Sequence, residues 1–252
     1  MGESACPLCG GTGWKIVERD ELSGAERCPC QFAGRAQRLE EKAGIPELYR
    51  GASFENFKLP DTNPVARTGL ANVMLTVRAF VREYPNEKRP GLLLIGEPGT
   101  GKTHLAVAAL RKLIERGFEG YFFDYQTLLE RIRAGYDEAS HSSAREAYNF
   151  ALETDLLLLD DLGAHRVTDW VEDTVTAIIT HRCNQRKALI ATTNLFDPDA
   201  ETAAESGPGK LYSRTTLAER IGARARSRLF EMCRVVRMPL VEDFRVRQSA
   251  RF

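Results

Sequence analysis

A glycine-rich segment, Gly96-Glu-Pro-Gly-Thr-Gly101-Lys102-Thr103, has the residue types and spacing to bind phosphate. It fits G-x-x-x-x-G-K-[ST], in which glycines let backbone N–H groups turn inward around phosphate oxygens. An apolar run precedes it and a helical pattern follows, so the positive end of that helix would face the same anion, and an unliganded turn is disfavoured. Lys102 would reach the β- and γ-phosphates of ATP, and Thr103 would bind Mg²⁺. We expect nucleotide contacts from Gly96, Glu97, Pro98, Gly99, Thr100, Gly101, Lys102, Thr103 and His104.

An acidic pair follows a run of four leucines, Leu156 to Leu159. Strand ends of a parallel sheet open into the ligand crevice, so Asp160 is placed to hold Mg²⁺ through water. Asp161 would orient or deprotonate the attacking water. The alternatives are an exposed acidic turn, or a site that binds ATP and barely hydrolyses it. The second arises because many ATPases of this class carry the longer glutamate where Asp161 stands.

A third polar strand end, Ala191-Thr-Thr-Asn194, falls beside the same crevice. Asn194 resembles the sensor residue of AAA+ proteins, which contacts the γ-phosphate or the attacking water. Taken alone, an asparagine here is a turn residue; its order and spacing after the two phosphate-site motifs favour the sensor role.

An arginine cluster, Gly222-Ala-Arg224-Ala-Arg226-Ser-Arg228-Leu-Phe230, lies on an expected helix before the last strand. Arg224 and Arg228 share one helix face and Arg226 points elsewhere. A solvated basic face is the plain interpretation. The order S-R-L-F nevertheless resembles the AAA+ arginine-finger region, in which an arginine reaches the γ-phosphate bound by a neighbouring subunit. That resemblance favours Arg228, with Arg224 second, and implies self-association through Arg228.

Four cysteines lie in the first thirty residues, as Cys6-Pro-Leu-Cys9 and Cys28-Pro-Cys30. Two short-spaced pairs can fold onto one tetrahedral Zn²⁺ with thiolate ligands, and such a short segment would need the metal to fold. Free thiols or a redox pair are the alternatives, because C-x-C is tighter than the usual C-x₂-C. Cys183 and Cys233 lie in helix and strand patterns, which favours core positions.

Three regions separate by composition. We expect a cysteine-rich zinc module at 1–32, a helical linker at 33–58 with a polar helix at 35–43, and an ATPase domain at 59–252. In the last region strands alternate with amphipathic helices, which indicates a parallel sheet flanked by helices. The expected strands are 92–95, 121–123, 156–159, 188–192 and 235–238, and the expected helices include 127–134 and about 169–185.

The end of the chain adds two expectations. Fourteen residues follow Met238, too few for the helical lid that usually follows an AAA+ core. Arg245 could partly replace the second sensor arginine that such a lid carries, although the sequence alone does not assign it that role. The polar loop from Phe196 to Lys210 suggests no function.

Composition narrows the class of protein further. Apolar residues make up 43% of 252, which is enough for a real core, and no run of 18 apolar residues or basic-apolar N-terminus occurs. We therefore expect a cytoplasmic protein that does not span a membrane. Basic and acidic residues balance at 35 each, so net charge neither indicates nor excludes nucleic acid.

With these motifs, the chain resembles the bacterial replicative helicase loader family (DnaC/DnaI type) and its relatives, the IstB-type transposition helper ATPases. The resemblance rests also on I-P-x-x-Y at 45–49 and S-F-E-N-F at 53–57. It implies an AAA+ core with a five-stranded parallel sheet and no lid. It also implies a hexameric replicative helicase as partner, bound through residues 1–50, with single-stranded DNA near Arg131 or Arg133.

Two other functions remain open. A transposition helper would share the ATPase and serve a transposase on duplex DNA; the cysteine module mildly favours the loader. A P-loop kinase of small molecules is disfavoured because the chain offers a sensor strand and a late finger-like arginine in place of an acceptor pocket and an arginine-rich lid.

Overall fold

The structure is a computed structural model that describes the chain except residues 1–5, 20–21, 62, 135–140, 199–214 and 250–252. The loop predicted at 196–210 therefore lies largely outside the described residues. No helix among the described residues is long and apolar enough to cross a membrane.

A five-stranded parallel sheet forms the centre of the molecule, in the order β4-β5-β6-β3-β7. The strands are β3 (Gly91–Ile95), β4 (Gly120–Asp124), β5 (Leu156–Asp160), β6 (Ala188–Thr193) and β7 (Cys233–Arg237). β3 and β6 are neighbours with Ile95 opposite Thr193, so the glycine-rich loop after β3 starts beside the end of β6. The predicted parallel sheet is confirmed, and the last strand begins two residues earlier than predicted.

Alternate residues of the strands feed two separate cores. Leu92, Leu94, Leu158 and Ile190 belong to one cluster, and the intervening residues such as Leu93 belong to the other. Successive side chains of a strand point to opposite faces, and a parallel sheet covered on both faces needs both sets apolar. This is why the central strands are nearly continuous leucine, isoleucine and alanine.

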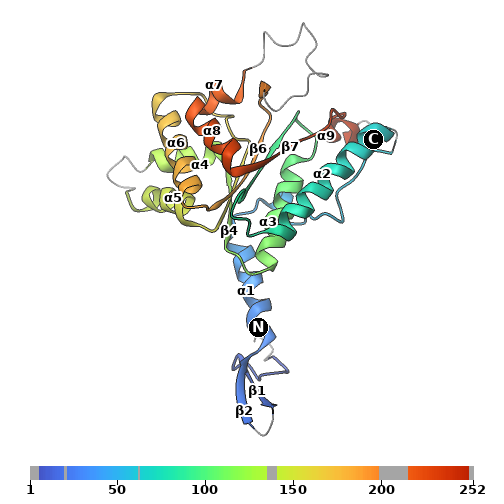
Figure 1. Cartoon of the computed structure of the whole chain (residues 1–252), viewed down its shortest axis with the longest axis vertical. Coiled ribbons are helices and arrows are strands. Elements are labelled where there is room, and N and C mark those ends of the chain that lie inside the picture. The colour runs from blue at the N-terminus through green and yellow to red at the C-terminus, as the bar shows by residue number, and fades with distance from the viewer. Residues whose placement is uncertain (1–5, 20–21, 62, 135–140, 199–214, 250–252) are drawn as a thin grey trace.

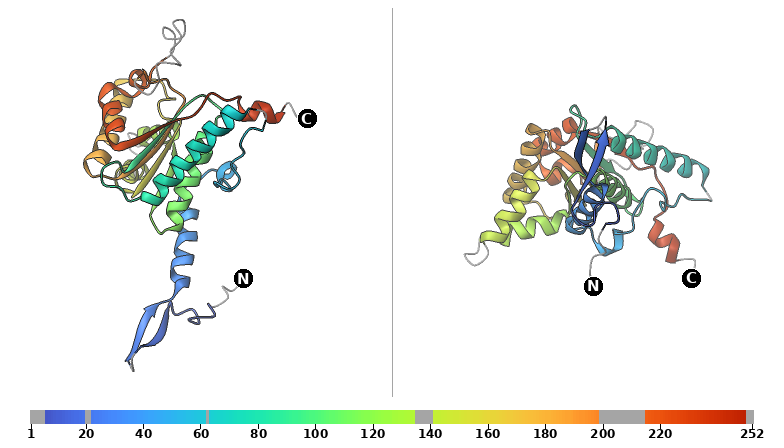
Figure 2. Two further views of the ribbon diagram at one scale, coloured as in Figure 1. Left: turned by 45° about the vertical axis from the view of Figure 1, so that its right-hand side comes forward. Right: turned by 90° about the horizontal axis from the view of Figure 1, so that it is seen from below.

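Helices cover both faces (Figures 1 and 2). On the first lie α2 (Pro64–Glu83) and α3 (Lys102–Glu115). The second carries α4 (Tyr125–Ala134), α5 (His141–Glu153), α6 (Asp169–Asn184), α7 (Leu217–Ile221) and α8 (Ala223–Met232). A short helix, α9 (Phe244–Ser249), follows β7 and lies near the start of α2.

The N-terminal part projects away from the sheet (Figure 2). It consists of an antiparallel hairpin, β1 (Trp14–Arg19) and β2 (Leu22–Arg27), followed by α1 (Pro29–Lys42). The hairpin is not among the sequence predictions. α1 begins at the second cysteine pair and acts as a stalk that ends against the parallel sheet and α3.

The segment between α1 and α2 is packed onto the core rather than extended. Ala43, Ile45, Ala52 and Phe54 are buried in the first cluster, and η1 (Glu47–Tyr49) lies between them. The Phe122 N–H donates to the Ala43 carbonyl at 2.7 Å, which ties the end of the stalk to the edge strand β4. Along α3, Arg111 donates to Glu40 at 2.6 Å and to the Ala52 carbonyl at 2.7 Å. The stalk is thus attached directly to the helix that begins at the glycine-rich loop.

Candidate nucleotide site and cysteine cluster

The glycine-rich loop joins β3 to α3, as its sequence predicts. Gly99 and Gly101 have φ values of 72° and 92°, in the left-handed region that favours glycine. Gly101 also lies against the Phe57 ring, which would be 2.5 Å from a Cβ at that position. The loop conformation and the approach of Phe57 therefore both require glycine here.

Lys102 is buried and folded back onto the loop. Its ammonium donates to the Gly96 and Glu97 carbonyls, each at 2.8 Å. Burial lowers the pKa of Lys102 to about 8, against the opposite influence of Asp161 and Asp160. The ammonium is thus bound to carbonyls that lie six and five positions earlier in the chain. It would have to leave these carbonyls to reach a bound phosphate.

Asp160 is nearly buried at the end of β5 and is held by β6. The Thr192 hydroxyl donates to its carboxylate at 2.6 Å. Burial raises the pKa of Asp160, while the hydrogen bonds from Thr192 and from Thr103 act in the other direction. Asp160 and Thr103 are therefore neighbours, as a shared Mg²⁺ ion would require.

Asp161 and Asn194 face each other across the ends of β5 and β6. The Asn194 amide donates to the Asp161 carboxylate at 2.9 Å, and the Asp161 N–H donates to the Thr192 hydroxyl at 3.0 Å. Asp161 has a φ of 53°, which is uncommon for a residue with a side chain and is tolerated best by Asp and Asn. The predicted base and the predicted sensor are brought into contact by this turn.

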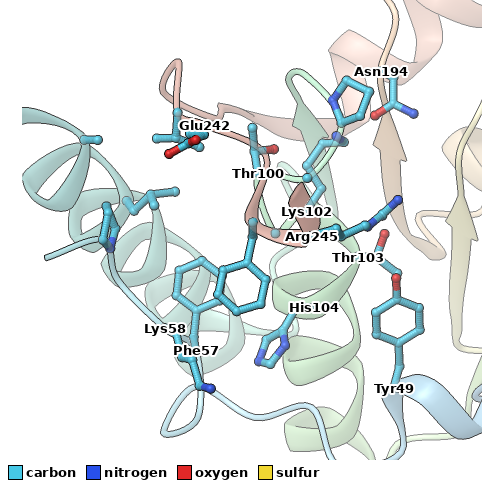
Figure 3. Close-up of a pocket in the computed structure, with 18 of the residues that line it drawn as sticks. Tyr49, Phe57, Lys58, Thr100, Lys102, Thr103, His104, Asn194, Glu242 and Arg245 are labelled. Carbon is cyan, nitrogen blue, oxygen red and sulfur yellow. The ribbon is translucent and has the colours of Figure 1, made fainter. Parts of the chain in front are cut away.

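These residues surround a cavity of about 650 Å³ (Figure 3). Of the predicted site residues, Pro98 to His104, Asp161 and Asn194 line it, whereas Gly96, Glu97 and Asp160 are not among its lining residues. A volume of this size suits a nucleotide. His104 turns away from the phosphate end, because its ring contacts the Ser53 carbonyl at 2.8 Å.

The other wall of the cavity was not assigned from the sequence. It comes from the segment after α1, the start of α2 and the segment after β7; its residues are Leu48, Tyr49, Asn56, Phe57, Lys58, Pro60, Asn63, Ala66, Leu70, Val241, Glu242, Phe244 and Arg245. The apolar members can hold a base, since a purine ring binds between apolar and aromatic side chains. The sequence feature that could have indicated this wall is the presence of aromatic residues in an otherwise polar linker.

The arginine cluster lies apart from this cavity, on α8. Arg228 is 44% exposed and pairs with Glu231 at 2.7 Å, and Arg224 is exposed with no hydrogen bond or ion pair to the described residues. Arg226 is different: it donates to the buried Asp197 at 2.8 and 2.6 Å and lies over the Phe230 ring. Neither Arg224 nor Arg228 lines the cavity of its own chain.

The four N-terminal cysteines converge on one point. Their sulfur atoms lie within 4.8 Å of one another, with Cys6–Cys28 at 3.8 Å and Cys9–Cys30 at 3.4 Å. Four thiolates about 2.3 Å from a tetrahedral zinc ion have sulfurs about 3.8 Å apart. The Gly13 N–H donates to the Cys9 sulfur at 3.3 Å and lowers the pKa of that thiol to about 6. All four are free cysteines, and their arrangement fits a metal ion.

Comparison with known proteins identifies the family. The family model described as IstB-like ATP binding protein matches residues 35–201, which is more than half of the chain. The chain belongs to the IstB-like ATP-binding family. Together with the sheet order and the loop after β3, this makes the region around the parallel sheet an AAA+ core that binds ATP.

Replication proteins are among its relatives. The chain is 26% identical over 163 residues to the replicative helicase loader DnaC of Buchnera aphidicola (Schizaphis graminum), covering 65% of this chain and 63% of that protein. It is 25% identical to Escherichia coli K12 DnaC, covering 73% of each. A crystal structure of the DnaC helicase loader matches with a TM-score of 0.60 and 31% identity, covering 77% of this chain and all of the other. The predicted resemblance is confirmed at the family level.

Proposed function

We propose that this IstB-like protein hydrolyses ATP with Mg²⁺ and uses it to load the replicative DNA helicase onto single-stranded DNA. The observation that carries the proposal is the 31% identity to a DnaC helicase loader across the whole of that solved chain. The cavity supports it, because Lys102, Thr103, Asp161 and Asn194 line it. Asp160 does not line it but lies next to Thr103.

The roles follow from position. Lys102 leaves the loop carbonyls and binds the β- and γ-phosphates, while Thr103 and Asp160 would hold a Mg²⁺ ion. Asp161 positions the attacking water, and its hydrogen bond with Asn194 supports a role for the Asn194 amide at the same water or at the γ-phosphate. A Mg²⁺ ion bound by these residues would supply positive charge to neutralise the phosphate oxygens.

Arg228 completes the site of a neighbouring subunit. Its partner Glu231 is on the same helix and exposed, so a γ-phosphate can replace that carboxylate. Mixing two inactive variants tests this role. Arg228→Ala keeps a complete cavity, and Asp161→Asn keeps its arginine, so the mixture should recover turnover that neither variant has alone. If Arg228 does not have this role, mixing Arg224→Ala with Asp161→Asn in the same way tests whether Arg224 reaches the neighbouring site.

The cysteine module holds Zn²⁺ through Cys6, Cys9, Cys28 and Cys30 and presents the hairpin to the helicase. The hairpin carries exposed apolar side chains, with Trp14 52% and Ile16 79% exposed, and the stalk holds them away from the core (Figure 1). Exposed apolar surface of this kind is typical of protein–protein contacts. The zinc ion would supply most of the folding free energy of the module.

The experiment is light scattering on a sizing column with the host's replicative helicase, with and without ATP. A complex is expected with the full chain. Removing all of residues 1–50 would also remove Ala43 and Ile45 from the core, so a shorter deletion of residues 1–28 is the better variant. Loss of the complex with intact nucleotide binding supports docking through the module. If no complex forms with any nucleotide, the transposition helper becomes the better function, and binding to duplex DNA with a transposase is the next assay.

A further inference from the structure

The stalk helix α1 is attached to the core at its C-terminal end. Glu40 accepts a hydrogen bond from Arg111 of α3 at 2.6 Å, and Ala43, the residue after the helix, is bonded to β4. Leu39 packs against the first core cluster. Nearer the N-terminus, residues 34–38 are exposed or half-buried, and Figure 2 shows this part of the helix standing away from the sheet. Packing against the core therefore stabilises the last turns of α1.

The sequence of α1 makes it a weak helix on its own. A helix shorter than about 12–15 residues is marginal in water unless packing supports it, and α1 has 14 residues. Gly34 lies in its interior, where glycine disfavours the helix by about four- to fivefold relative to alanine. Within the described part of the chain, its first turn contains no acidic residue and the Cys28 side chain at the N-cap makes no capping hydrogen bond. The N-terminal half of α1 therefore needs another source of stability.

The cysteine cluster lies at this weak end of the helix. Cys28 is the N-cap of α1, and Cys30 is in its first turn. Their sulfurs lie 3.8 and 3.4 Å from those of Cys6 and Cys9. Binding of one metal ion by all four would fix the N-cap and the first turn relative to each other, which removes much of the cost of starting a helix. Four thiolates outweigh the charge of one Zn²⁺ ion, so the centre would be anionic and would interact favourably with the helix N-terminus.

We propose that metal binding by the four cysteines keeps α1 helical before Leu39, so that the metal sets the distance between the hairpin and the core. As a helix, the 14 residues of α1 span about 21 Å. Without the metal, the first turns of α1 unfold and the hairpin is joined to the core by a flexible chain, because only the last turn is bound to Arg111 and β4. The inference rests on the metal-binding role proposed for the cysteine module. It adds a consequence outside that module, since the presentation of Trp14 and Ile16 then depends on the metal.

Far-UV circular dichroism of the full chain tests the proposal, with Zn²⁺ bound and after its removal by a chelator under reducing conditions. Removal should lower the helical signal by the equivalent of roughly ten residues, the part of α1 before Leu39. In the metal-free chain, Gly34→Ala should recover part of that signal through a shift of about four- to fivefold in the helix–coil equilibrium. With Zn²⁺ bound the helix is already formed, so the same variant should match wild type.

Gly51→Ala is the matched control. It adds the same methyl group in open space and outside a helix, so it should change neither the zinc-bound nor the metal-free spectrum. At Gly34 the added methyl group approaches the end of the Arg38 side chain, which can move. Amide hydrogen exchange then locates the change. Removal of Zn²⁺ should speed exchange at residues 31–38 by at least about tenfold and leave α3 protected.

Three results would overturn the proposal. The first is an unchanged helical signal after measured release of Zn²⁺. The second is a loss of protection in α3 as well as α1, which would show that the metal supports the whole chain. The third is a metal-free Gly34→Ala chain with the same signal as metal-free wild type. If the full chain binds no Zn²⁺, the metal site proposed above fails together with this inference, whereas bound Zn²⁺ with a metal-independent α1 overturns the inference alone.

Discussion

Thr192 supports both acidic residues of the site, so replacing it with valine is the most informative single change. Its hydroxyl donates to the Asp160 carboxylate at 2.6 Å and accepts the Asp161 N–H at 3.0 Å. The side chain is fully buried, and valine has nearly the same shape. Thr192→Val therefore removes two hydrogen bonds with little change in packing.

The expected loss of stability comes from those two bonds. A hydrogen bond to a charged group contributes about 1.5–3 kcal/mol, and a buried N–H left without a partner costs about 1–3 kcal/mol. Because the two share one hydroxyl and water can reach Asp161, we expect a combined loss of about 2–4 kcal/mol. For a chain of this size that corresponds to a fall in Tm of roughly 4–16 °C.

The loss should also depend on pH. Burial already raises the pKa of Asp160, and removing the Thr192 bond raises it further. An acid whose pKa is raised on folding costs no stability below its unfolded pKa, and the cost grows as pH rises through the folded pKa. Thr192→Val should therefore be destabilised less near pH 4 than at pH 7.5.

Urea unfolding of nucleotide-free protein at both pH values measures this difference. Thr192→Ser should restore most of the stability, since it keeps the hydroxyl. Thr193→Val is the matched control: it loses neutral hydrogen bonds, to the Leu162 carbonyl and from the Leu195 N–H, so its loss should not vary in this way with pH. A change under 0.5 kcal/mol at pH 7.5 for Thr192→Val, taken as roughly the spread of neutral substitutions, would refute the reasoning.

Three further predictions concern groups elsewhere in the chain. Burial lowers the pKa of Lys102 from 10.5 to about 8. Between these pH values the unfolded chain binds more protons than the folded chain, so the free energy of unfolding should rise from pH 8 to pH 10.5. Urea unfolding should show that Lys102→Met flattens this rise. Arg182 is fully buried and donates to the carbonyls of Ala151, Leu152, Asp155 and Ala188. Arg182→Met should therefore lower the free energy of unfolding by at least about 3 kcal/mol in the same assay. Arg186→Met, at an exposed position, should change it little. Purified chain should release one zinc per chain on denaturation, measured by elemental analysis, and Cys9→Ser should lose the metal without losing ATP binding; metal-free wild type with a folded hairpin would contradict the zinc assignment.

The sequence predicted the parts of the site that depend on local pattern. The runs Leu92 to Ile95 and Leu156 to Leu159 are long enough and apolar enough to indicate buried strands. The position of such a strand largely fixes the position of the glycine-rich loop or acidic pair that follows it. Parallel pairing then brings Asp161 and Asn194 together, because β5 and β6 end at the same edge.

Features that depend on long-range packing were not predicted. Phe57 and Arg245 are far apart in sequence and reach one cavity because the segments that carry them both pack onto the phosphate-binding loop. Helical spacing correctly places Arg226 on a different face from Arg224 and Arg228. It does not indicate that Arg226 binds the buried Asp197, which follows β6. The helix α2 had a readable signal, since its apolar residues recur every three or four positions after Asn63 and Pro64.

The central claim is that the chain places a closed helicase ring on single-stranded DNA with ATP. The direct measurement is the number of helicase hexamers bound to circular single-stranded DNA, counted after filtration, with and without the chain and ATP. A circle has no end to thread, so we expect hexamers on the circle when the chain and ATP are both present, and few with Lys102→Ala. Equal occupancy of the circle with and without the chain would contradict it.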